Sequence, residues 1–162
     1  MKNLLAFLMM TLMIPGFSKE VTSGKVVTVI DGNTVQLTGD DNESYKIVLQ
    51  GIDCPELGQE FGDQAKLLLS KLILDKNVSV QLHGKDRWGN NVGIILINGT
   101  IDPRYELLEA GLAWTSERNP VQEFEAIKNT AKENGKGLWQ EPNPTPPWVY
   151  RRQQTLMQVK SS

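Results

Sequence analysis

The sequence has little of three things that would narrow its function at once: cysteine, excess positive charge and long apolar runs. A single cysteine among 162 residues excludes an internal disulfide and a zinc site built from several cysteines. The 17 basic and 19 acidic residues give a net charge of −2, unlike a protein that depends on nonspecific attraction to phosphate. With 22% charged and 40% hydrophobic residues, the composition is that of one ordinary globular domain.

The N-terminus has the pattern of a Sec-type signal peptide. Lys2 supplies a positive start, and an apolar run of 11 residues covers 4–14, too short for the about 20 residues that span a bilayer. Gly16 and Ser18 are small residues placed for cleavage after residue 18. Removal of residues 1–18 leaves 16 basic and 19 acidic residues, a net charge of −3. We expect export to a periplasm or beyond, with no membrane segment in the mature chain; the alternative is a buried N-terminal helix.

Turn signals divide the rest of the chain into short alternating segments. Five strands are expected, at residues 25–30, 34–38, 43–49, 78–82 and 92–97. Three helices are expected: one with an apolar face over 61–73, one from Pro103 behind an Asp102 cap, and one with Pro120 at its first position behind an Asn119 cap. This order predicts an α+β, mainly β fold: a five-stranded OB-fold barrel with about three helices, over residues 19–140.

Residues 141–162 form a proline-rich C-terminal tail. Pro142, Pro144, Pro146 and Pro147 favour an extended, polyproline-like backbone. Two interpretations stay open: the tail is a ligand for a partner protein, or Trp148 packs it onto its own barrel.

Acidic residues follow the first and third expected strands. Asp31 lies in the first turn, and Asp53 and Glu56 follow the third strand. If the barrel closes, these three carboxylates share one rim, and a shell of oxygen atoms suits a hard cation such as Ca²⁺. The alternative is that turn aspartates only satisfy backbone donors.

Four segments resemble the staphylococcal nuclease (thermonuclease-like) family, and they span about residues 25–139. They are Val29-Ile30-Asp31-Gly32-Asn33-Thr34-Val35, Leu49-Gln50-Gly51-Ile52-Asp53-Cys54-Pro55-Glu56, Asp86-Arg87-Trp88-Gly89-Asn90 and Gly137-Leu138-Trp139. The resemblance implies a five-stranded OB barrel with three helices and Ca²⁺-dependent hydrolysis of DNA or RNA phosphodiesters.

The resemblance also implies roles for individual residues. Asp31 and Asp53 match metal-site aspartates, and the backbone carbonyl of Cys54 matches a further metal ligand. Glu56 stands for the glutamate that positions or deprotonates the attacking water. Asn33 replaces a metal-binding aspartate; it keeps a carbonyl oxygen but loses a negative charge, so the affinity for Ca²⁺ should fall.

The two arginines that bind phosphate in that family are replaced here by Val48 and Asn90. Neither side chain can make the bidentate, permanently charged contact of arginine. Losing one preorganised donor costs roughly 10²–10³ in rate, and a catalytic arginine in phosphoryl transfer is worth about 10³–10⁵. Hydrolysis is therefore expected to be strongly weakened or lost.

These replacements leave two main hypotheses. The first is an inert or weakened nuclease barrel that serves as a monomeric binding module, for single-stranded nucleic acid or another ligand in the OB groove. The alternative is an active exported Ca²⁺-dependent endonuclease, in which Lys46, Arg87 or Lys85 replaces the missing arginines.

Three further observations stay open. Cys54 and His83 could act as nucleophile and base, although His83 reads more readily as an ordinary barrel residue. Trp88 and Trp114 could stack bases or pack against the domain. A positively charged groove would have to gather the basic residues Lys46, Lys85, Arg87, Arg151 and Arg152.

Overall fold

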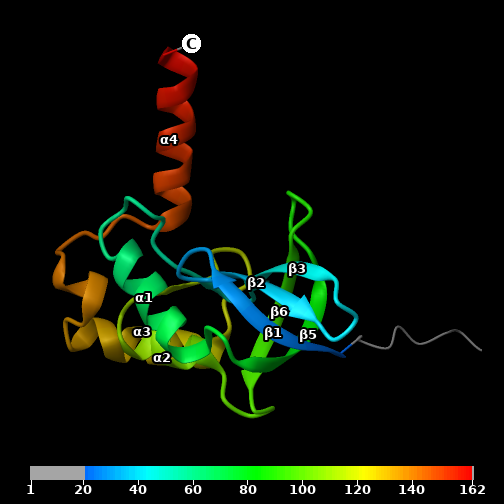
Figure 1. The fold of residues 1–162 in the computed structure, drawn as a ribbon. Coiled ribbons are helices and arrows are strands. Elements are labelled where there is room, and N and C mark those ends of the chain that lie inside the picture. The colour runs from blue at the N-terminus through cyan, green and yellow to red at the C-terminus, as the bar shows by residue number, and fades with distance from the viewer. Residues whose placement is uncertain (1–20, 162) are drawn as a thin grey trace, which may run out of the picture.

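The computed structural model describes residues 21–161, so the expected signal peptide lies outside the described residues. Its elements, in chain order, are β1 (Val21–Val29), β2 (Thr34–Gly39), β3 (Ser44–Leu49), β4 (Ile52–Asp53), α1 (Gly62–Ile73), β5 (Asn77–Lys85), β6 (Asn91–Ile97), α2 (Pro103–Glu109), β7 (Trp114–Thr115), α3 (Gln122–Glu133), the 3₁₀ helix η1 (Gly137–Gln140) and α4 (Pro147–Ser161). Figure 1 shows the barrel beside a group of helices, with α4 projecting from the body.

Alternating apolar residues build the barrel strands. Val35 and Leu37 of β2 and Ile47 and Leu49 of β3 are buried, while Lys46, the residue before Ile47, is exposed. The strands are ordered β1-β2-β3-β6-β5 and close into a barrel, because β1 pairs with β5 and β3 pairs in parallel with β6. The prediction of an α+β, mainly β fold with a closed five-stranded barrel is confirmed.

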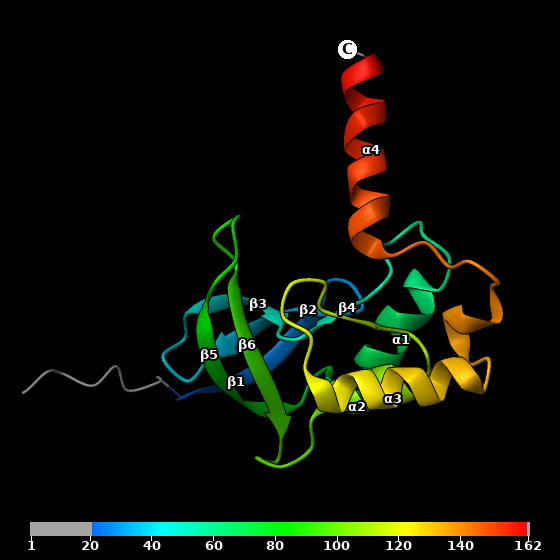
Figure 2. The ribbon, with the colours of Figure 1, turned by 180° about the vertical axis from the view of Figure 1, so that it is seen from behind.

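The first two expected helices form where the sequence places them. Ala65, Leu69 and Ile73 make the buried face of α1. The side chain of Asp102 caps α2 by accepting the backbone N–H of Arg104 at 3.0 Å, and Pro103 is the first helical residue. Figure 2, seen from behind, shows α3 next to α2, beside the barrel.

The expected start of α3 is wrong. The helix begins at Gln122, and Val121, in an extended conformation with φ −87° and ψ 123°, is its N-cap; Asn119 and Pro120 lie in the preceding loop. Contacts with the rest of the domain set this start. The Val121 side chain lies over Gly51, and Glu125 in the first turn of α3 accepts a hydrogen bond from the Thr115 hydroxyl.

The tail contains a helix that the sequence analysis did not expect. Residues 142–146 are not helical, but α4 runs for 15 residues from Pro147. Proline suits the first turn of a helix, since its missing N–H has no intrahelical partner there. After Pro147 the tail contains neither glycine nor proline, so nothing in it interrupts the helix.

Within residues 21–161, no helix combines the length and the apolar character needed to cross a bilayer.

We predict that Leu69→Ala destabilises the fold by about 2–5 kcal/mol, because it leaves a cavity between α1 and the barrel. Leu69 is fully buried, whereas Leu67 on the same helix is 55% exposed. The matched control Leu67→Ala should change the free energy of unfolding by no more than about 0.5 kcal/mol. Urea unfolding measures both values, and equal losses would contradict the packing of α1 described above.

Candidate active site at the barrel rim

Closure of the barrel brings the turn after β1 against the segment after β4. The side-chain oxygen of Asn33 accepts the backbone N–H of Cys54 at 3.1 Å, and the Cys54 thiol donates to the carbonyl of Gly32 at 3.2 Å. A Cβ on Gly32 would lie 2.6 Å from the Cβ of Cys54 and 2.7 Å from that of Ala65. The two segments can approach this closely only because residue 32 is glycine.

Three carboxylates lie around Cys54. Burial is the main reason why the pKa of the Cys54 thiol is raised well above its usual range. Negative charges add to this shift, in the order Asp53, Asp31, Glu56, so all three act on one point of the rim. The thiol is 2% exposed and stays protonated, which does not suit the nucleophile role considered for Cys54.

Arg151 of α4 binds two of these carboxylates. Its Nη1 donates to Oδ1 of Asp53 at 3.0 Å and to Oε1 of Glu56 at 2.6 Å, and its Nη2 donates to Oδ2 of Asp53 at 2.7 Å. The hydrogen bonds to Asp53, above all, and those to Glu56 raise the pKa of Arg151, although burial opposes the shift. The guanidinium is therefore a permanent positive charge within the acidic cluster.

Two sets of contacts hold the start of α4 in place. Trp148 packs edge-on against Trp114 at 5.6 Å between ring centroids, and Trp114 packs against Trp139 at 4.5 Å. Gln59 accepts the backbone N–H of Glu56 at 3.1 Å and donates to the carbonyl of Thr145 at 2.5 Å. Trp148 thus packs the tail onto its own domain, and Gln59 ties the proline segment to the acidic loop.

The donor groups expected to bind Ca²⁺ are engaged with one another and with Arg151. Both oxygens of Asp53 accept from the guanidinium, the Asn33 oxygen accepts from Cys54, and Oδ1 of Asp31 accepts the backbone N–H of Asn33 at 2.9 Å. Over residues 21–161, no three His, Cys, Asp or Glu side chains converge as a metal site. In this arrangement the donors do not fit a calcium ion, which takes about 6–8 oxygen ligands.

The two expected arginine positions have other tasks. Val48 lies in β3, half-buried, opposite Thr34 of β2 on one side and Val92 of β6 on the other. Asn90 donates from its backbone and side-chain nitrogens to Asp86, at 2.9 and 2.8 Å. Asn90 therefore closes the turn between β5 and β6, and both residues are part of the barrel framework.

The candidate substitutes Lys46, Lys85 and Arg87 belong to the exposed surface of β3 and of the β5–β6 hairpin. The guanidinium of Arg87 lies 4.0 Å from the ring centroid of Trp88, which is 63% exposed. Lys46 is near enough to Asp86 for its charge to contribute to the lowered pKa of that carboxyl. Among the described contacts, Arg151 is the basic residue that reaches Asp53 and Glu56.

In the sequence, Arg151 is only one of several basic residues considered for a positively charged groove. The absence of arginine at positions 48 and 90 is the one sequence signal that suggests an arginine from elsewhere in the chain. No spacing rule links a tail residue to a site 95 to 98 positions earlier in the chain.

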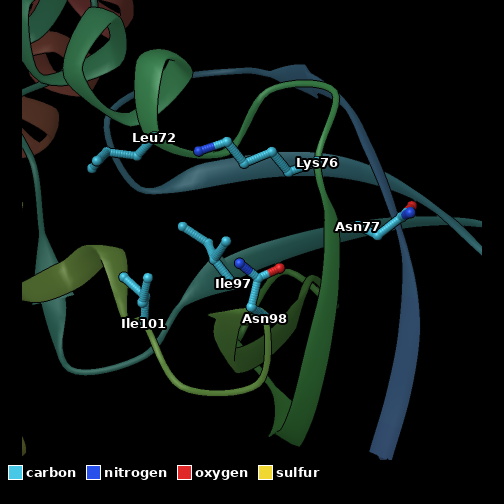
Figure 3. Close-up of a pocket in the computed structure, with 6 residues that line it drawn as sticks. All are labelled: Leu72, Lys76, Asn77, Ile97, Asn98 and Ile101. Atoms are coloured by element: carbon cyan, nitrogen blue, oxygen red, sulfur yellow. The ribbon is translucent and has the colours of Figure 1, made fainter.

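A pocket of about 370 Å³ lies elsewhere (Figure 3). It is lined by Leu72, Lys76, Asn77, Ile97, Asn98 and Ile101. These residues come from the end of α1, the start of β5 and the end of β6, whereas the acidic rim follows the end of β3, which pairs with the start of β6. The pocket contains no acidic residue and is separate from the acidic site.

The chain is a small α+β domain in which helices pack beside a closed barrel and an acidic site lies at the barrel rim. The model of the family described as "Staphylococcal nuclease homologue" matches residues 46–141. This chain belongs to the staphylococcal nuclease family.

Relatives of the chain carry names consistent with this family. An Escherichia coli protein named "Uncharacterized endonuclease" is 31% identical over 129 residues, covering 79% of this chain and 84% of that protein. A Haemophilus influenzae protein of the same name is 30% identical over 156 residues, covering 94% of this chain and 86% of that protein. "Probable staphylococcal-like nuclease CAN2" of Oryza sativa subsp. japonica is 35% identical over 113 residues, 68% of this chain and 30% of that protein.

We predict a pH-dependent contribution to stability from Asp86. Burial opposes the shift, but hydrogen bonds from Asn90 and Trp88 and the charge of Lys46 lower the pKa of Asp86 from 3.8. The carboxylate therefore stabilises the fold above about pH 4, and this contribution disappears as the pH falls through its folded-state pKa.

Thermal melting of Asp86→Asn tests this prediction. The melting temperature should fall relative to wild type at pH 7, and the difference should shrink as the pH falls below 3.8 and through the lowered pKa of Asp86. Glu117→Gln, an exposed charge on another loop, is the control and should show little change. A difference between Asp86→Asn and wild type that stays constant with pH would be inconsistent with the lowered pKa.

Proposed function

We propose that this chain is an exported nuclease-family protein that binds single-stranded nucleic acid and has strongly weakened phosphodiester hydrolysis. The observation that carries the proposal is that Val48 and Asn90, which the family resemblance aligns with two arginines, are built into the barrel. Neither can stabilise the charge that grows on a phosphate during hydrolysis.

The state of the acidic pair supports weak hydrolysis. Glu56 is the residue that would orient the attacking water, but its Oε1 accepts from Arg151 at 2.6 Å. Arg151 thus occupies a carboxylate oxygen of Glu56 that would otherwise be available to an attacking water.

The β5–β6 hairpin supports binding of single-stranded nucleic acid. Trp88 presents an exposed ring, and Arg87 stacks on it, a combination that suits base stacking and phosphate contact. Lys46, exposed on β3, places a further positive charge near this hairpin. These positive charges are local, since the net charge of the whole chain is −2.

A second candidate is an active endonuclease. Lys46 lies close enough to Asp86 to affect its pKa, and Asp86 binds Asn90, which occupies an expected arginine position. Lys46 could therefore serve a phosphate near that position. The names of the bacterial relatives also favour this candidate.

Digestion of single-stranded DNA by the mature wild-type protein, with Ca²⁺ and with chelator, separates the two candidates. We expect binding but no Ca²⁺-dependent cleavage above the background given by Glu56→Ala. The variant that combines Val48→Arg, Asn90→Arg and Asn33→Asp should increase cleavage by at least about 10²-fold. Wild-type cleavage that is lost in Glu56→Ala would establish an active enzyme, and a folded but inert triple variant would show that these positions are wrongly assigned.

Export is supported by the basic start, apolar run and small residues of 1–18. We predict that the protein, expressed with its full N-terminus in a bacterium, accumulates outside the cytoplasm and starts at Lys19. Mass spectrometry of the intact protein in each cell fraction measures this. A cytoplasmic protein that keeps residues 1–18 would refute export; replacing Leu8 by Arg in the apolar run is the control that should block processing.

A further inference from the structure

The acidic site already contains a cation, which the chain itself supplies. Arg151 lies in the second turn of α4 and makes three hydrogen bonds of 2.6 to 3.0 Å to Asp53 and Glu56. Its side chain is 35% exposed, and those of Asp53 and Glu56 are 19% and 33% exposed. The three side chains are thus partly withdrawn from water. Ion pairs in such a partly buried position are screened less than those at an open surface.

We propose that Arg151 is the resident cation of the acidic site, in the place where the family resemblance implies a divalent metal, so that Ca²⁺ binds only when the guanidinium leaves. This inference goes beyond the proposed function and does not depend on whether hydrolysis remains.

The geometry of the contact supports this role. The planar guanidinium offers N–H groups in a fork that matches the two oxygens of a carboxylate, and both oxygens of Asp53 are bound in this way. The remaining N–H of Nη1 reaches Glu56, so one group bridges the two acids. A single guanidinium thus joins two neighbouring carboxylates, as a bound cation would.

The charge balance also supports it. Asp31, Asp53 and Glu56 carry −3, and Arg151 adds +1, which gives −2. With aspartate at position 33 the acids would carry −4, and a divalent ion would add +2, which again gives −2. The replacement of aspartate by Asn33 and of a divalent ion by Arg151 thus compensate each other.

The attachment of α4 makes Arg151 a strong competitor for the site. Trp148 on Trp114, and Gln59 between Glu56 and Thr145, hold the first turns of α4 beside the carboxylates. A group tethered over a short span has an effective concentration of about millimolar or more. The tether therefore keeps the guanidinium at the carboxylates at a high local concentration, against which free Ca²⁺ has to compete.

Calcium binding tests the proposal without any activity measurement. Isothermal titration with CaCl₂ is carried out on wild type, Arg151→Gln, Asn33→Asp and the double variant, each as the full mature chain. We expect Arg151→Gln to increase the affinity for Ca²⁺ by at least about tenfold, in the wild-type background, in the Asn33→Asp background or in both, with Asn33→Asp adding to the gain.

Two measurements control for misfolding. Arg152→Gln removes the same charge from the next, exposed residue of α4 and should leave Ca²⁺ affinity within about twofold of wild type. Without Ca²⁺, Arg151→Gln should melt at a lower temperature than wild type, because two carboxylates lose their partner, and Ca²⁺ should restore part of the loss. Arg151→Lys keeps the positive charge but not the forked geometry of the guanidinium. Its melting temperature without Ca²⁺ should lie between those of wild type and Arg151→Gln.

The proposal is overturned if removal of Arg151 leaves Ca²⁺ affinity unchanged in both backgrounds, or if Arg152→Gln raises the affinity as much as Arg151→Gln does. A different result would refute the proposed function: cleavage of DNA by the wild-type protein, whatever its affinity for Ca²⁺.

Discussion

The parallel pairing of β3 with β6 is the constraint on which the rest of the molecule depends. It joins the three-stranded meander to the β5–β6 hairpin and, with the β1–β5 pairing, closes the barrel. In the closed barrel the turn at Gly32 packs against Cys54, and this contact places Asp31, Asp53 and Glu56 on one rim. The acidic site is therefore a product of the barrel topology. A helix outside the barrel, α4, then adds Arg151 to it.

Features encoded by local pattern could be predicted from the sequence. The alternation around Leu37 and Ile47, and the Asp102–Pro103 start of α2, depend on neighbouring residues and are found as expected. The expected start of α3 at Pro120 is wrong, because packing of Val121 over Gly51 outweighs the local preference for a helix capped by Asn119. The helix α4 was missed because the four prolines dominate the tail composition, although three of them precede the helix and the fourth begins it.

For the site, the sequence predicted which acids lie near the turn but not what neutralises them. Motif comparison assigns residues to positions that a family already uses, and Arg151 has no such position. Its location is fixed by the contact of Trp148 with Trp114 and by the bridge through Gln59. Packing of the tail by Trp148 was one of two interpretations of the sequence, but the sequence does not show that this packing brings Arg151 to the acids. A loss of charge at an expected position can be made up by a residue from any element that packs nearby.

The long separation of Arg151 from its partners has a consequence for the order in which the molecule is made. Every barrel strand and α1 precede α4 in the chain, so a growing polypeptide can assemble the rim before Arg151 has been synthesised. Until α4 is synthesised and packs on the domain, the acids face solvent, and only ions from solution can balance their charge. The electrostatics of the nascent domain therefore differ from those of the finished one, because the rim receives its arginine last.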